Sequence, residues 1–143
     1  MLKLIKEAWG WIGFSDPEEV MAQNEFGNVI FRDSEKRFWR ICPEELSCET
    51  VAGSQLEYAQ LWEKEDVLRD WQMGPLVEVA LAKYGAQPEG RCFCLKMPAM
   101  FGGTYEVDNF GTITILELIS FTGDAAKQIK DLPARTKIRF RFI

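Results

Sequence analysis

The stretch FRDSEKRFWRICPEEL, residues 31–46, predicts a β-hairpin. Two runs rich in β-branched and aromatic residues, FGNVIF (26–31) and FWRIC (38–42), flank the polar segment Asp33–Lys36, which is typical of a turn. The same stretch crowds three arginines, a tryptophan, a cysteine and four carboxylates into sixteen residues. It therefore raises the question of whether the hairpin is a reactive site, a contact surface or only part of the sheet.

A four-residue loop fixes the expected pairing of the two strands. It places Phe31 opposite Phe38, Ile30 opposite Trp39, Val29 opposite Arg40 and Arg32 opposite Arg37. Alternation along the second strand then puts Phe38, Arg40 and Cys42 on one face and Arg37, Trp39 and Ile41 on the other. Both faces carry apolar side chains. We therefore expect one face to build the core and the other to be covered by a helix or partly presented to a partner.

The segments that follow and precede the hairpin predict an alternation of helices and strands. SDPEEVMAQN (15–24) has a capping residue, a proline at the first helical position and carboxylates in the first turn, so it predicts a short helix. LSCETVA (46–52) predicts a third strand. GSQLEYAQLWEKEDVLRDW (53–71), capped by Ser54, and GPLVEVALAKYG (74–85) predict two helices, because their apolar residues recur at three- and four-residue steps.

The remaining segments complete a single α+β domain over residues 1–143. MLKLIKEAWGWIGF (1–14) predicts an amphipathic helix or turn packed on the domain. GDAAKQIKDLP (123–133) predicts a short helix ended by proline, and a turn is expected at Asp108–Gly111. Further strands are expected at RCFCLKMP (91–98), GTYEVDNF (103–110), TITILELISF (112–121) and KIRFRFI (137–143). Together these elements predict a mostly antiparallel sheet with helices packed on it.

The charge of the chain is unevenly distributed. Its 143 residues carry a formal net charge of −5, but residues 1–70 hold eight Lys and Arg against fifteen Asp and Glu, whereas residues 71–143 hold nine against seven. An acidic half is a poor candidate for direct nucleic-acid binding, which depends on clustered basic residues. It is a better candidate for meeting a basic partner, or it is simply a solvated face.

The residue types present argue against most catalytic chemistry. The chain contains no histidine, which removes Ser-His and Cys-His mechanisms and most catalytic zinc sites. Glu44 and Glu45 are adjacent, so their side chains diverge rather than form a converging acid/base pair. The glycines at Gly102 and Gly103 match no phosphate-binding pattern. We expect no catalytic residue, no cofactor and no enzyme activity.

The four cysteines are expected to be buried, reduced thiols of a cytoplasmic protein. Their spacings, C-x5-C for Cys42 and Cys48 and C-x-C for Cys92 and Cys94, both differ from the C-x2-C pair of structural zinc sites. Cys42 follows Arg40 closely, so a lowered thiol pKa is the alternative to a core position. We expect no metal site. No segment reaches the roughly 18 apolar residues that a membrane span requires.

Three segments together resemble one bacterial family. NEFGNVIFRDSEKRFWRICPEELSCETVA (24–52), WQMGPLVEVALAKYG (71–85) and GRCFCLKMPAMFGGTYEVDNFGTITILELISFTGDAAKQIKDLP (90–133) resemble the immunity proteins that neutralise DNase toxins delivered by type VI secretion. The resemblance runs from Trp9 to Pro133. A looser resemblance, in WGWIGF (9–14) and in the alternation of helices with an antiparallel sheet, links the chain to the SUKH group of immunity proteins.

The resemblance implies a cytoplasmic protein that binds a cognate toxin, a basic nuclease, and blocks it by stoichiometric occlusion without catalysis. A nuclease must carry basic residues to hold phosphates, so an acidic inhibitor can cover that surface and speed the encounter. Candidate contacts, chosen for charge, hairpin position or helix exposure, are Asp33, Glu35, Trp39, Glu44, Glu45, Glu63, Glu65 and Asp66.

Other functions remain open at this stage. A small-ligand or regulatory binding module would use a pocket beside MFGGTYEVDNFG (100–111), with Tyr105, Asp108 and Asn109 as its polar groups. A hydrolase would require carboxylates that converge in a cleft. An exposed sheet edge would also allow a homodimer.

Overall fold

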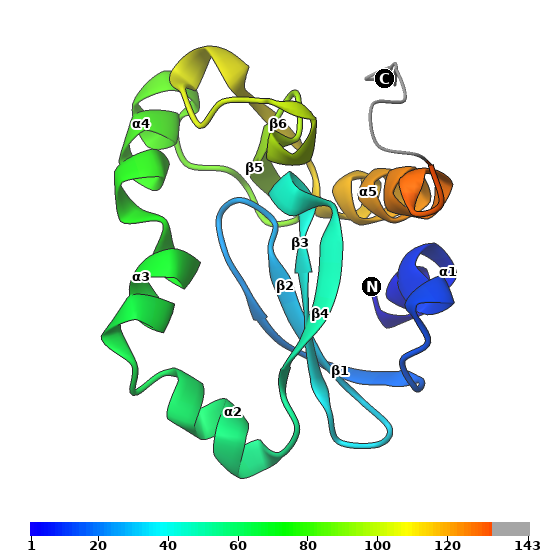
Figure 1. Cartoon of the computed structure of the whole chain (residues 1–143). Coiled ribbons are helices and arrows are strands. Elements are labelled where there is room, and N and C mark those ends of the chain that lie inside the picture. Colours follow the sequence, from blue (N-terminus) through cyan, green and yellow to red (C-terminus); the bar gives the residue numbers. More distant parts are fainter. Residues whose placement is uncertain (133–143) are drawn as a thin grey trace.

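A four-stranded antiparallel sheet forms the centre of the structure, a computed structural model that describes residues 1–132. Its strands lie in sequence order and are β1 (Pro17–Gln23), β2 (Val29–Asp33), β3 (Phe38–Cys42) and β4 (Ser47–Ala52) (Figure 1). A smaller antiparallel sheet joins β5 (Arg91–Leu95) to β6 (Phe110–Thr114). The architecture is a single α+β domain with helices packed on the sheets, as the sequence predicts.

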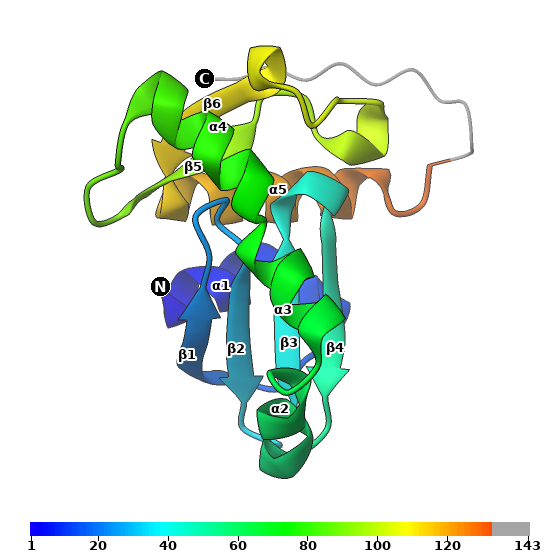
Figure 2. The same cartoon turned by 90° about the vertical axis from the view of Figure 1, so that its left-hand side faces the viewer.

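Helices cover both faces of the large sheet. Two of them, α1 (Leu2–Trp9) and α5 (Ile115–Ile129), lie on one face, and α2 (Gln55–Leu61) and α3 (Glu65–Gln72) cross the other (Figure 2). The next helix, α4 (Gly74–Tyr84), continues from α3 towards β5 and β6. Four short 3₁₀ turns in the described part of the chain connect these elements: η1 (Gly10–Ile12), η2 (Pro43–Glu45), η3 (Ala99–Phe101) and η4 (Val107–Asn109).

Side chains that alternate between the two faces of the large sheet build two apolar layers. Val29, Phe31 and Ile41 are fully buried on the side of α1 and α5, whereas Ile30 and Phe38 are buried under α2. The ring of Phe38 stacks on Tyr58 of α2 with centroids 4.5 Å apart. The faces expected for β3 are therefore confirmed, and both are covered. A third apolar cluster, built on Phe26, Phe93 and Phe110, joins the small sheet to α4.

The predicted register of the β2–β3 hairpin is wrong by one residue. The observed pairs are Phe31 with Trp39, Ile30 with Arg40, Val29 with Ile41 and Arg32 with Phe38. The loop has three residues rather than four, because Asp33 donates its backbone N–H to the Arg37 carbonyl. The Asp33 carboxylate accepts the backbone N–H groups of Glu35 and Arg37, and Lys36 adopts a φ of +66°. This geometry is typical of a three-residue hairpin loop whose last residue adopts the left-handed backbone conformation.

The segment 15–24 is a strand, so the predicted helix there is wrong. Pro17 begins β1, an edge strand in which a missing N–H costs no hydrogen bond inside the sheet. The carboxylates that suggested a helix start instead form cross-strand ion pairs, from Glu18 and Glu19 to Arg32 and from Glu18 to Lys36. Charges on an exposed edge also oppose pairing with another chain, which weighs against the homodimer that an exposed sheet edge would allow.

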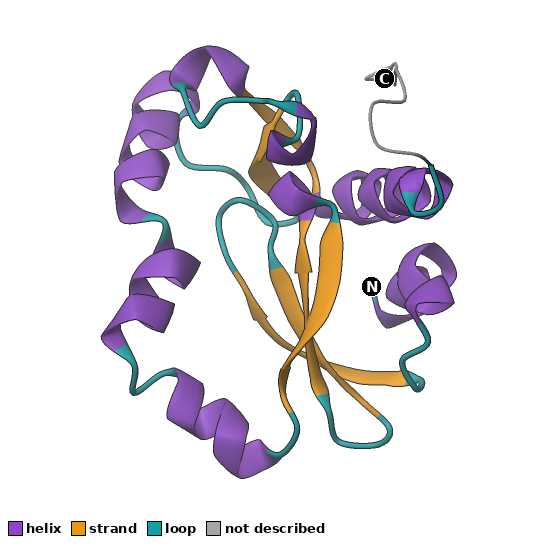
Figure 3. Cartoon of the chain, in the orientation of Figure 1, coloured by secondary structure: helices purple, strands orange, loops and turns teal. Residues whose placement is uncertain are grey.

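The structure also differs from the prediction for the strands of the C-terminal half. Of TITILELISF, only the part up to Thr114 is strand, and Ile115 begins a 15-residue helix that includes residues 123–129 of the helix predicted at 123–133 (Figure 3). The proline predicted to end that helix, Pro133, lies outside the described residues. Thr114 caps this helix by accepting the N–H of Glu117 at 3.2 Å. Residues 103–109 of the predicted strand 103–110 form a loop containing η4, and Phe110 begins β6. The turn predicted at Asp108–Gly111 therefore joins no hairpin, and β6 pairs with β5. The strand predicted at 137–143 lies outside the described residues.

The predictions for the other elements agree with the structure. The N-terminal helix, β4, β5 and α4 form at the expected places, and Ser54 caps α2 by accepting the N–H of Glu57. The helix predicted over 53–71 is divided into α2 and α3 by a short turn. Among the described residues, no helix is long and apolar enough to cross a membrane.

Close packing between α1 and α5 depends on a glycine. A Cβ atom added to Gly123 would lie 2.5 Å from the carbonyl oxygen and 2.8 Å from the Cβ of Ala8. At this crossing the indole N–H of Trp11 donates to the carbonyls of Ala8 and Gly123, at 3.1 and 3.2 Å. Any side chain at position 123 therefore separates the two helices.

Replacing Gly123 with alanine should lower the free energy of unfolding by about 1–3 kcal/mol, because the overpacking penalty exceeds the gain of about 1 kcal/mol in helix propensity. Gly74→Ala is the matched control, since a Cβ there meets nothing within 4 Å and should cause no loss of stability. Urea denaturation of the three proteins measures both effects. A Gly123→Ala variant as stable as the parent would contradict the packing argument.

Candidate functional site

A pocket of about 590 Å³ opens on the α3 side of the sheet, where β3 turns into β4. Its walls come from β3, η2, β4, the junction between α3 and α4, and the loop before β6. Four carboxylates and one guanidinium line it: Glu44, Glu45, Glu49, Asp70 and Arg40. The apolar part of its wall comes from Val51, Met73 and Leu76, and Tyr105 lies at its edge.

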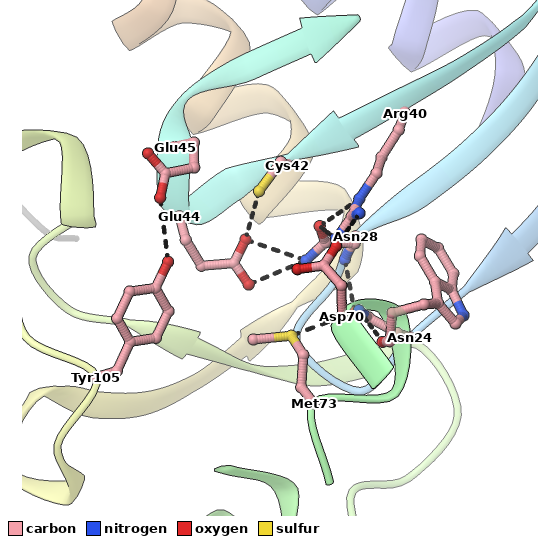
Figure 4. A network of polar contacts seen from close by, with 10 residues as sticks. Asn24, Asn28, Arg40, Cys42, Glu44, Glu45, Asp70, Met73 and Tyr105 are labelled. Carbon is pink, nitrogen blue, oxygen red and sulfur yellow. Dashed lines mark hydrogen bonds and ion pairs between the residues drawn. The ribbon is translucent and has the colours of Figure 1, made fainter. Parts of the chain in front are cut away.

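A buried carboxamide organises the inner wall of the pocket (Figure 4). Asn28 is fully buried, and its Nδ2 donates to both carboxylate oxygens of Glu44 at 2.9 and 3.0 Å. Its Oδ1 accepts from Nε and Nη2 of Arg40 at 3.1 and 2.9 Å. Asn28 itself is fixed by a turn, since the Asn24 side-chain oxygen accepts the N–H groups of Phe26 and Asn28. The network therefore begins in the β1–β2 connection.

Glu44 is a buried carboxylate without an ion pair among the described residues. It is 3% exposed, and besides Asn28 its partner is the Cys42 thiol, whose Sγ lies 3.0 Å from Oε2. Burial raises the pKa of Glu44, since desolvation outweighs the opposing hydrogen bonds from Cys42 and Asn28 and the attraction of Arg40. Burial, and then the Glu44 charge, raise the pKa of Cys42, which contradicts a lowered value beside Arg40.

Arg40 and Asn24 tie the helices to the sheet. Arg40 Nη1 contacts Asp70 Oδ2 of α3 at 2.6 Å, and its guanidinium lies 5.2 Å from the ring centroid of Trp71. Asn24 Nδ2 donates to the Trp71 carbonyl at 2.9 Å and contacts the sulfur of Met73 at 3.6 Å. These contacts fix the α3–α4 junction as a wall of the pocket.

The remaining wall is a loop that is held in one shape by Asn109. The Asn109 side chain accepts the N–H of Met97 and donates to the carbonyls of Met97 and Thr104, each at 2.9 Å. Gly103 approaches the same backbone so closely that a Cβ there would lie 1.8 Å from the Met97 oxygen. The loop presents Tyr105, whose hydroxyl donates to Glu45 Oε1 at 3.2 Å. Tyr105 is 41% exposed, and partial burial together with the charges of Glu44 and Glu45 raises its pKa.

The eight contacts predicted from the sequence fall in three regions. The hairpin region holds Asp33, Glu35 and Trp39, the pocket holds Glu44 and Glu45, and the surface near the α2–α3 junction holds Glu63, Glu65 and Asp66. Asp33 and Glu44 are 1% and 3% exposed. The Trp39 indole donates to Asp33 at 2.9 Å and packs against Phe14, so these two residues stabilise the hairpin. Glu35, Glu45 and the three carboxylates near the α2–α3 junction are exposed.

The structure brings one residue of the alternative pocket together with this group. Tyr105 lines the pocket beside Glu44 and Glu45, whereas Asn109 is engaged in holding the loop, and Asp108 does not line the pocket. Sequence reasoning missed Asn28, Glu49 and Asp70 as parts of the site. The pattern NEFGN (24–28), with an asparagine on each side of a turn glycine, was a usable signal for the first of these.

The pocket is better suited to binding than to catalysis. Glu44 turns inward to Asn28, while Glu45 turns outward to Tyr105, so the two adjacent carboxylates diverge as expected. A raised pKa leaves the Cys42 thiol protonated near neutral pH, which makes it a weak nucleophile. All four cysteines are free, and no group of His, Cys, Asp and Glu within residues 1–132 could hold a metal ion. A cluster of carboxylates next to an aromatic ring favours a cation.

Comparison with known proteins identifies one family. The model of the family described as "T6SS immunity protein Tdi1, C-terminal" matches residues 54–125, from α2 to most of α5. No curated protein sequence matches the chain. The matched region supplies Asp70, Met73, Leu76 and Tyr105 of the pocket, and the preceding sheet supplies Arg40 and the three glutamates.

The raised pKa of Glu44 predicts a specific pH dependence of stability. Because the folded state holds this proton more tightly than the unfolded chain, Glu44 stabilises the fold below the ordinary glutamate pKa of about 4.3. This contribution is lost as the pH rises through the folded value. Each tenfold change in proton affinity is worth about 1.4 kcal/mol.

Glu44→Gln should remove that loss, so the stability difference between variant and parent should grow in favour of the variant as the pH rises. Urea denaturation at a series of pH values from 4 to 8 measures it, with Glu45→Gln as a control for one formal charge. Parallel stability curves for Glu44→Gln and the parent would contradict the assignment.

Proposed function

The chain belongs to the family of the T6SS immunity protein Tdi1, C-terminal, and from this membership we propose that it binds a cognate antibacterial toxin and neutralises it by stoichiometric occlusion. The family match is the observation that carries the proposal. The proposed toxin is a nuclease, and the inhibitor needs no catalytic group of its own. In this proposal residues 1–143 act as one immunity domain.

The charge distribution supports a basic partner. Residues 1–70 carry fifteen carboxylates against eight basic residues. The exposed surface of α3 and of the turn before it adds Glu63, Glu65 and Asp66, beside the acidic pocket. A nuclease concentrates Lys and Arg where it holds phosphates, so a surface of opposite sign can cover that site and exclude DNA. Complementary potentials also raise the rate of encounter.

The distribution of exposed residues selects among the candidate contacts. A standard protein complex buries on the order of 1,600 Å² in total, which is one contiguous patch on each partner. The pocket and α3 are contiguous, since Asp70 of α3 lines the pocket. We therefore place the toxin on this side, where Glu45, Glu63, Glu65 and Asp66 are exposed. Asp33 and Trp39 support the fold in this proposal rather than contact the toxin.

A second candidate function is a binding module for a small ligand. The observation that favours it is the pocket beside Tyr105, where a flat surface would have argued against it. The ligand would be a small cation, given the carboxylates that line the walls. Saturation of the pocket by such a compound, without any effect on toxin binding, would favour this function over the first.

The direct test of the proposal is whether the chain protects cells from the toxin. Cells that express the toxin encoded by the neighbouring gene should survive when this chain is co-expressed, and isothermal titration calorimetry should give a stoichiometric complex of the two purified proteins. A complex without protection would limit the function to binding. Absence of both binding and protection would refute the proposal.

The steering role of α3 predicts a kinetic effect. Glu63→Lys, Glu65→Lys and Asp66→Lys combined should slow association at low salt by about tenfold or more and reduce the salt dependence of the association rate. A control variant with the same charge change, Glu7→Lys, Glu117→Lys and Asp124→Lys, lies on α1 and α5 on the opposite side of the sheet. Stopped-flow association kinetics distinguish the two, and equal slowing in both variants would contradict a local role for α3.

A further inference from the structure

The carboxylates of the pocket carry charge that the described part of the chain leaves unneutralised. Arg40, the one cationic residue among those lining the pocket, is already paired with Asp70 and bonded to Asn28. Within residues 1–132, Glu44, Glu45 and Glu49 form no ion pair. Burying a carboxylate such as Glu44 without a cationic partner is costly, and a cation that enters the pocket would offset that cost.

The shape of the pocket matches a long side chain with a charged end. Val51, Met73 and Leu76 supply an apolar wall, while the carboxylates and the Tyr105 hydroxyl supply acceptors. The side chains of lysine and arginine match this arrangement, because each has an apolar alkyl stem and a cationic head. A volume of about 590 Å³ leaves room for such a side chain and for water. The acidic half of the chain adds charge complementarity over a wider area.

Contacts within the chain hold the rim of the pocket. The Asn109 side chain accepts one hydrogen bond and donates two, and these bonds and the close approach at Gly103 hold the loop that carries Tyr105. The same loop exposes Met97 and Met100, at 39% and 55%. A preformed rim with exposed methionines and a tyrosine lowers the entropic cost of binding a protein surface.

From these observations we infer that the pocket is the anchor point for one basic side chain, lysine or arginine, on the surface of the toxin. The side chain inserts between η2 and the loop at Tyr105, where Glu44, Glu45 and Glu49 receive its charge. Asn109 is a positioning residue for this contact. The inference rests on the proposed function and adds the location and chemistry of the central contact.

The test compares two variants that remove the same charge. Glu45→Gln with Glu49→Gln neutralises exposed carboxylates of the pocket, and Glu117→Gln with Asp124→Asn neutralises exposed carboxylates of α5 on the opposite side. Both pairs are on the surface, and thermal unfolding verifies that each variant folds. The probe is the toxin encoded by the neighbouring gene, titrated by calorimetry at 150 mM salt. The pocket variant should bind at least tenfold more weakly, and the α5 variant within about twofold of the parent.

Each other outcome overturns the inference in a recognisable way. If the parent chain does not bind the toxin, the proposed function fails and the inference fails with it. If the parent binds and the pocket variant binds equally well, the proposed function stands and the anchor point is elsewhere. Equal weakening of both variants indicates a general charge effect. If the pocket instead holds a second copy of the chain, sedimentation shows a dimer that the pocket variant loses, which also overturns the inference.

Discussion

The carboxamide of Asn28 separates a buried carboxylate from a guanidinium, and the site depends on this separation. An amide carries an NH₂ group and a carbonyl oxygen, so Asn28 makes two hydrogen bonds to Glu44 as donor and two to Arg40 as acceptor. Because Asn28 bonds to both, Arg40 keeps Nη1 for Asp70 of α3, while Glu44 is held by hydrogen bonds and has no ion pair within residues 1–132. One fully buried residue therefore fixes the position of η2 and of β3 and, through Arg40, the position of α3.

This arrangement explains how a fold with two covered sheet faces offers a binding surface. The turn of the β2–β3 hairpin stabilises the fold, because the Asp33 carboxylate accepts hydrogen bonds from the loop backbone and from the Trp39 indole. At the other end of β3 the chain turns through η2 and exposes Glu45 beside a loop from the second half of the molecule. The pocket thus joins the family-matched region to the sheet that precedes it, and neither part forms it alone.

The sequence predicted the fold class and most elements, but it failed where local signals competed. Pro17 with its neighbouring carboxylates satisfies the rules for a helix start, yet the ion pairs to Arg32 form only across strands. The β-branched run around Thr114 suggested a strand, although Thr114 and Glu117 have the spacing of a helix cap. The pocket was predictable only in part, because Asn28 and Asp70 are far apart in sequence and meet through tertiary packing.

The acidic pocket and the loop held by Asn109 are the toxin-binding surface that we propose for this member of the immunity family. Hydrogen–deuterium exchange of the chain, alone and in complex with the toxin, tests it most directly. We expect slower amide exchange in the complex for residues 43–50 and 97–109, with α1 and the exposed face of α5 unchanged. Protection confined to α1 and α5, with residues 43–50 and 97–109 exchanging as in the free chain, would contradict it.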